Sequence, residues 1–102
     1  MLADTLAPMG PVVPRRMFGG YGLFMDGLMF ALIAGDHLYF KVDDQTLAAF
    51  QQEGLGPFTY QSKGQPRTLK SYYCSPEYLL DDPDEMVSWG NAAFGAARRA
   101  AK

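Results

Sequence analysis

The sequence has 102 residues, of which 48% are hydrophobic and 20% charged, and its formal net charge is −2. The length and composition predict one folded domain over residues 1–102. The negative net charge argues against a nucleic-acid-binding protein, because such proteins are typically net positive. The single cysteine, Cys74, excludes an internal disulfide and suits a reducing compartment. No apolar segment has membrane-spanning length, and the N-terminus does not follow a signal-peptide pattern. We therefore expect a cytoplasmic domain that does not enter the membrane.

A short helix and an edge strand are the first elements expected. Leu2–Ala7 can form the helix, which the following Met9-Gly10-Pro11 ends. Val12–Phe18 has the composition of a strand. Pro14 favours an edge position for it, because proline has no backbone N–H to donate to a neighbouring strand.

Residues 19–43 predict a three-stranded antiparallel meander. Asp26-Gly27 and Gly35-Asp36 each stand between apolar runs, and such pairs are typical of two-residue hairpin turns. The first turn would set Leu23 opposite Phe30, and the second would set Leu32 opposite Tyr39.

Alternation along these strands then assigns two faces. We expect the uncharged face, with two glycines that allow close approach, to be the core under a helix. This face carries Gly20, Gly22, Phe24, Met29, Ala31, Ile33, Leu38, Phe40 and Val42. The expected outer face carries Tyr21, Leu23, Met25, Leu28, Phe30, Leu32, Ala34, His37, Tyr39 and Lys41.

A second helix and a second strand pair follow the meander. Asp43-Asp44 can cap a helix that runs through Glu53 and ends at Gly54. Phe58–Gln61 and Thr68–Cys74 are predicted strands around a polar turn at residues 63–66. Alternation along the second strand puts Leu69, Ser71 and Tyr73 on one face, and Lys70 and Tyr72 on the other.

The last helix has the clearest boundary in the sequence. Asp82 can cap it, Pro83 suits its first position, and Glu85 stands where the acid of a capping box belongs. Arg98, Arg99 and Lys102 suit the negative end of its dipole. The predicted order is helix, strands, helix, two strands, helix. This order indicates an α+β fold, a two-layer sandwich with an antiparallel sheet.

No pattern of catalytic or metal-binding residues occurs. His37 is the only histidine and Cys74 the only cysteine, so a metal site would have almost no ligands. A cysteine nucleophile needs a neighbouring base, which the sequence does not indicate. We therefore predict no enzyme activity, no metal and no cofactor.

Two kinds of partner remain open. The outer face is apolar for a solvated surface, which predicts that it is covered. The cover would be a second copy in a homodimer, another protein such as a transcription factor, or the chain's own N-terminal segment or final helix. Its contact residues would be Tyr21, Leu23, Phe30, Leu32 and Tyr39. The alternative is direct nucleic-acid binding by a basic patch with an aromatic platform. That patch would comprise Arg15, Arg16, Lys41, the 63–70 segment with Lys63 and Lys70, and the platform Tyr72.

A family resemblance runs through most of the chain. It is carried by residues 15–24 (RRMFGGYGLF), 26–33 (DGLMFALI) and 38–43 (LYFKVD), and continues in Pro57–Tyr60, Lys63-Gly64 and Ser71–Tyr73. Together these segments resemble the TfoX/Sxy N-terminal domain family.

This resemblance implies an arrangement like that of the type III secretion chaperone fold. It also implies a role in transcription regulation of bacterial competence, the programme for DNA uptake and transformation. Members of the family resemble co-activators that work with a DNA-bound transcription factor. Longer members carry a second, C-terminal domain, which we expect this chain, ending at Lys102, to lack.

Overall fold

The computed structural model describes residues 2–17 and 19–101, which form four helical segments and six strands. The helical segments are the 3₁₀ helix η1 (Leu2–Met9), α1 (Leu47–Gln52), the 3₁₀ helix η2 (Glu77–Asp81) and α2 (Pro83–Ala100). The strands are β1 (Val13–Met17), β2 (Gly20–Met25), β3 (Leu28–Ala34), β4 (His37–Lys41), β5 (Pro57–Ser62) and β6 (Gln65–Cys74).

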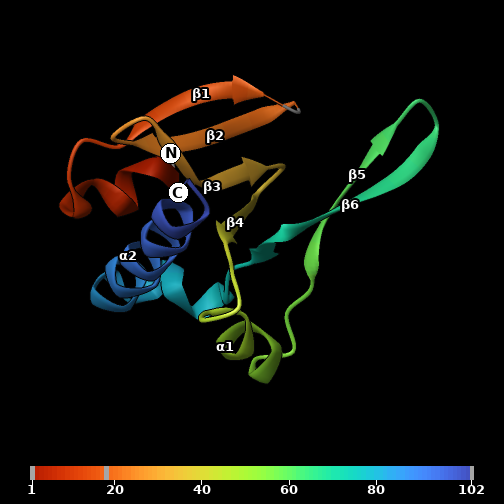
Figure 1. Ribbon diagram of the computed structural model, residues 1–102. Helices are drawn as coiled ribbons and strands as arrows, with labels where there is room; N and C mark the ends of the chain where they lie inside the picture. The colour runs from red at the N-terminus through yellow and green to blue at the C-terminus, as the bar shows by residue number, and fades with distance from the viewer. Residues whose placement is uncertain (1, 18, 102) are drawn as a thin grey trace.

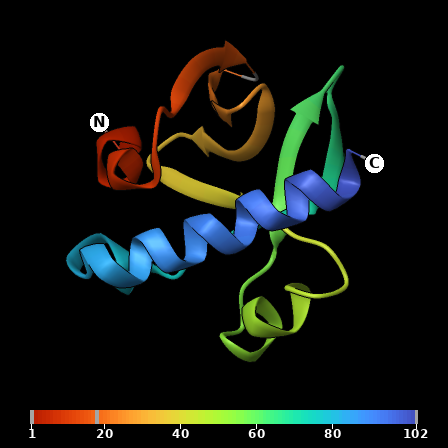
Figure 2. The same ribbon diagram turned by 60° about the vertical axis from the view of Figure 1, so that its left-hand side comes forward.

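The strands form one antiparallel sheet in the order β1-β2-β3-β4-β6-β5, and α2 lies across one of its faces (Figures 1 and 2). The predicted α+β fold with two layers is therefore confirmed. Strand β1 is at the edge of the sheet, as Pro14 indicated. Phe18 and Lys102, which the sequence assigned to the first strand and the last helix, lie outside the described residues.

The main core lies between the sheet and the helical layer. Its largest side chains, among them Phe30, Phe40 and Met86, have no exposed surface. Phe30 meets the ring of Phe94 from α2 edge to face, with 6.1 Å between ring centroids. The buried cluster comprises Leu6, Leu23, Met25, Phe30, Ala31, Ile33, Leu38, Phe40, Val42, Phe50, Leu79, Met86, Ala93 and Ala97.

A β-bulge in β3 makes part of the predicted register wrong. Met25 pairs with Leu28 as expected, but Leu23 pairs with Ala31, because Phe30 is an extra residue without a partner on β2. An extra residue reverses the alternation on one side of the bulge. The second hairpin has no such insertion, and its predicted pairing of Leu32 with Tyr39 is confirmed.

The reversal exchanges the two faces of β2. Leu23 belongs to the cluster under α2, whereas Gly22 pairs with Leu32 on the opposite side of the sheet. The prediction that Gly22 faces the core under a helix is therefore wrong. A Cβ at Gly22 would stand 2.7 Å from the Sδ of Met29 and 2.8 Å from that of Met17, so these flexible side chains would have to shift to admit a larger residue.

A second, smaller cluster lies on the face of the sheet away from α2. Leu32, Phe58 and Tyr72 are buried in it, with 5% or less of their surface exposed. Leu69 packs against the same cluster, so Leu69 and Tyr72 share a face. The predicted alternation along β6 placed Leu69 on the same face as Tyr73. It is wrong at this point, where β6 departs from regular pairing with β5.

Helix α2 begins as predicted. The Asp82 side chain accepts a hydrogen bond of 3.2 Å from the backbone N–H of Glu85, and Pro83 occupies the first turn. Helix α1 is shorter than predicted and begins at Leu47. It ends as expected, with Gly54 at a φ of +74°. Within residues 2–17 and 19–101, no helix has the length and apolar character needed to cross a bilayer.

Candidate functional site

An open cavity of about 590 Å³ lies where η2 meets the ends of β4 and β6. We call it the η2 groove. Its position follows from the path of the chain, because the start of β4 lies beside the segment that follows β6. The Ser75 N–H there donates a 2.8 Å hydrogen bond to the Leu38 carbonyl. The groove is lined by Asp36, His37, Leu38, Cys74, Ser75, Glu77, Tyr78, Leu80 and Asp81.

Two large apolar side chains of the groove remain in contact with solvent. Leu79 is 1% exposed and holds η2 to the core, whereas its neighbours Tyr78 and Leu80 are 47% and 52% exposed. A 3₁₀ helix has three residues per turn, so consecutive side chains point in directions about 120° apart. When Leu79 faces the core, Tyr78 and Leu80 must therefore face outward.

The electrostatics of the groove are negative. Asp36, Glu77 and Asp81 line it together with the apolar pair. Burial, and then the charge of Glu77, raise the pKa of the Cys74 thiol. A raised pKa keeps the thiol protonated near neutral pH, which is the opposite of what a cysteine nucleophile requires. Among the residues that the structure describes, no three His, Cys, Asp or Glu side chains gather to hold a metal ion.

The structure does not bring the predicted protein-contact residues together. Leu23 and Phe30 are fully buried under α2, and Tyr21 packs against the same cluster. Leu32, 1% exposed, and Tyr39 belong to the cluster on the other face. The prediction that these residues share one apolar outer face is therefore wrong, because the bulge at Phe30 places their side chains on both sides of the sheet.

The predicted nucleic-acid cations lie in three different places on the sheet. Arg15 lies 5.1 Å from the ring centroid of Phe24, and Lys41 lies 5.2 Å from that of Tyr72. Arg16, opposite Tyr21, is on the side of the sheet that faces α2. The remaining cations, Lys63 and Lys70, are exposed on the hairpin of β5 and β6.

Tyr72 is not available as a stacking platform. Only 5% of its surface is exposed, and its hydroxyl donates a 3.1 Å hydrogen bond to the Met29 carbonyl. Burial raises the pKa of this hydroxyl to about 12. The alternation in the sequence did place Tyr72 opposite the face of Tyr73. It did not reveal that the sheet buries it in a second cluster.

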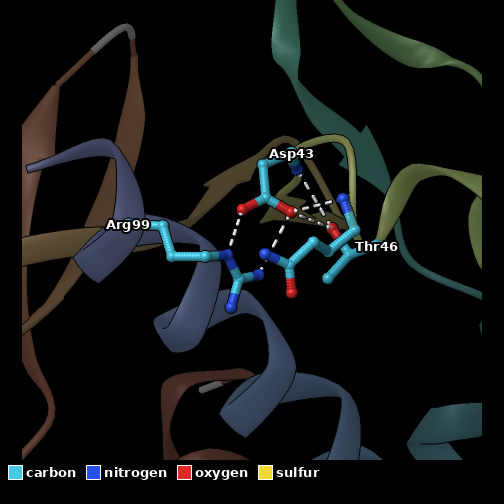
Figure 3. Close-up of polar contacts among 4 residues, drawn as sticks. Asp43, Thr46 and Arg99 are labelled. Carbon is cyan, nitrogen blue, oxygen red and sulfur yellow. Dashed lines mark hydrogen bonds and ion pairs between the residues drawn. The ribbon is translucent and has the colours of Figure 1, made fainter.

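Asp43, two residues after the end of β4, forms an ion pair with Arg99 of α2. Its carboxylate receives the Arg99 guanidinium, with 3.1 Å between Nη2 and Oδ1 and a second contact from Nε (Figure 3). The same carboxylate accepts the backbone N–H of Gln45 at 3.0 Å, and the Asp43 N–H donates to the Thr46 hydroxyl at 3.0 Å. These hydrogen bonds stabilise a turn over residues 43–46, after which α1 begins at Leu47.

Because of this ion pair, we expect the difference in stability between the parent and Asp43→Asn to depend on pH. The hydrogen bond from Arg99 is the main reason that the pKa of Asp43 lies below its usual value. Its contribution to folding is therefore complete above the unfolded-state pKa of about 3.9 and is lost as the pH falls through the lower folded-state value. The stability gap between the parent and Asp43→Asn should narrow on acidification, as measured by denaturant unfolding from pH 7 downward. A gap that stays constant would contradict this.

These observations define a small α+β domain with an acidic, partly apolar surface groove. The chain belongs to the TfoX N-terminal domain family, whose model matches residues 4–97. It is 28% identical over 94 residues to Protein Sxy of Escherichia coli (strain K12), which covers 92% of this chain and 44% of that protein. It is 31% identical over 74 residues to DNA transformation protein TfoX1 of Aliivibrio fischeri (strain ATCC 700601 / ES114), covering 72% of this chain and 35% of the relative. The chain thus spans less than half the length of each.

Proposed function

We propose that this domain is a non-enzymatic regulatory module that acts through protein–protein contacts in the control of bacterial competence. Its family and its similarity to a protein named for DNA transformation support the regulatory context. The observation that carries the proposal is the η2 groove, where exposed Tyr78 and Leu80 stand beside a cavity. Exposed apolar side chains grouped at a concave site are typical of protein-binding surfaces.

The charge of the groove specifies the chemistry of the partner. Asp36, Glu77 and Asp81 surround the apolar pair, so a partner segment with Lys or Arg beside apolar side chains would be complementary. The raised pKa of Cys74, in contrast, gives no support to a chemical reaction in the groove. We propose that the partner is a transcription factor that presents such a segment.

Site-specific cross-linking in the native cell tests this function. A photo-reactive amino acid in place of Leu80 should capture a DNA-binding transcription factor, identified by mass spectrometry. The matched control places the same amino acid at Ala48, an exposed position on α1, where no such capture is expected. The captured factor, once purified, should bind the parent protein and lose at least about tenfold in affinity for Leu80→Lys, because a charge in an apolar contact costs over 1.4 kcal/mol.

Three results would overturn the proposal. The first is capture of the same proteins from both positions. The second is equal affinity of the purified factor for the parent and for Leu80→Lys. The third is capture of a second copy of this chain alone, which would make the η2 groove a homodimer interface instead.

A further inference from the structure

The strands of this fold carry basic residues but no acidic ones. None of the eleven Asp and Glu residues lies in a strand; all of them are in helices, turns or connecting segments. Five of the nine Lys and Arg residues lie in strands, and Lys63 lies in the turn that joins β5 to β6. The chain therefore contains a positively charged region although its net charge is −2.

The positive charge is concentrated on the hairpin of β5 and β6. No acid occurs between Glu53 and Glu77, an interval that contains Lys63, Arg67 and Lys70. All three cations are exposed. No ion pair among the described residues engages any of them. Arg67 was not named individually in the sequence prediction, although it lies within the 63–70 segment.

The end of this hairpin projects from the molecule. Figures 1 and 2 show the paired strands extending beyond the layer that α2 covers. The two-residue turn at Lys63-Gly64, with φ values of +53° and +77°, closes the strands tightly, so they stay paired to the tip. We call residues 59–70 the cationic arm.

The base of the cationic arm is fixed to the rest of the fold. Phe58, immediately before the arm, is 3% exposed and packs in the second cluster with Leu32 and Tyr72. The ring centroids of Phe58 and Tyr39 are 4.8 Å apart. The arm therefore has a buried anchor and an uncovered, positively charged end.

We propose that the cationic arm binds the phosphate backbone of duplex DNA. A two-stranded ribbon fits the major groove, which is about 12 Å wide. The arm also carries Gln61 and Gln65, exposed amides that can bond to phosphate or base edges. A single-stranded ligand fits less well, because it needs exposed aromatic platforms. Phe58 and Tyr72 are buried, and Tyr60, which is half-buried, already stacks on Phe58 with 5.6 Å between ring centroids. This inference is independent of the η2 groove and of its partner.

The test compares two variants that remove the same number of charges. Arg67→Gln with Lys70→Gln alters the arm, whereas Arg16→Gln with Arg98→Gln removes two exposed cations elsewhere. Each phosphate contact contributes about 0.9 to the slope of log affinity against log salt. We therefore expect the arm variant to lose about 1.8 from this slope and at least about tenfold in affinity at 50 mM salt. The control should lose much less.

The measurement is fluorescence anisotropy with a labelled 20-base-pair duplex of mixed sequence, from 50 to 200 mM salt. Denaturation midpoints check that both variants are folded. Amide NMR shifts of the parent provide a second reading that needs no variant: addition of the duplex should perturb residues 59–70 most.

Several outcomes would overturn the proposal. They are failure of the parent to bind the duplex at 50 mM salt, an equal loss of affinity in both variants, and amide shift changes that are largest outside the cationic arm. Tighter binding to a labelled single strand, or to polyglutamate, would also overturn it, because the arm would then serve a different polyanion.

Discussion

Replacing Phe30 with alanine is expected to lower the free energy of unfolding by about 3–5 kcal/mol, the usual cost of truncating a buried phenylalanine. The side chain has no exposed surface and packs edge to face on Phe94 of α2. Truncation would therefore leave a cavity between the sheet and the helix. Chemical denaturation measures the change. It also distinguishes the structure from the interpretation by alternation, in which Phe30 lies on the outer face of the sheet.

Tyr78→Ala is the matched control for this prediction. It also removes an aromatic ring, but from a side chain that is 47% exposed. Its effect on stability should stay within about 0.5 kcal/mol. A similar denaturation midpoint for Phe30→Ala and Tyr78→Ala would show that Phe30 is not a core residue.

Replacing Gly20 with alanine should destabilise the protein by about 1–3 kcal/mol, the usual range for overpacking. The new Cβ would stand 1.9 Å from the Ile33 carbonyl oxygen. That oxygen belongs to the backbone of β3, which cannot move aside as a flexible side chain can. The two strands would have to separate locally, and thermal or chemical denaturation would record the loss.

Gly56→Ala provides the comparison. A Cβ at Gly56 has no neighbour within 4 Å among the described residues, and its φ is not in the left-handed region. Alanine there should leave stability unchanged or raise it by up to about 1 kcal/mol, since it restricts the unfolded chain. If both alanine variants unfold together, the close contact between Gly20 and Ile33 is absent.

Local sequence signals predicted the elements whose structure depends on local contacts. The cap of α2 involves Asp82 and Glu85, three residues apart, and the second hairpin depends on the Gly35-Asp36 turn. Both were predicted correctly. The Phe30 bulge has no comparable signal, because the hydrophobic residues around it are equally compatible with regular alternation.

Contacts between distant residues account for the other differences. The Asp43 carboxylate, expected to cap α1, is held by Arg99, which is 56 positions further along the chain. Tyr72 is buried because the sheet brings it against Leu32 and Phe58. Neither pairing follows from helical or strand periodicity. The exposed pair Tyr78 and Leu80 was also missed, since the short η2 gives no periodic pattern.

The separation of charge described above makes the domain an electric dipole. Six of the eleven acids, namely Asp36, Glu77, Asp81, Asp82, Asp84 and Glu85, belong to η2, the start of α2 and the nearby β3–β4 turn. In both views these helical segments and the tip of the cationic arm lie toward opposite sides of the molecule (Figures 1 and 2). A dipole of this kind rotates in the field of a polyanion before any contact forms. Near a nucleic acid, the domain would approach arm first, with its acidic end turned toward the solvent.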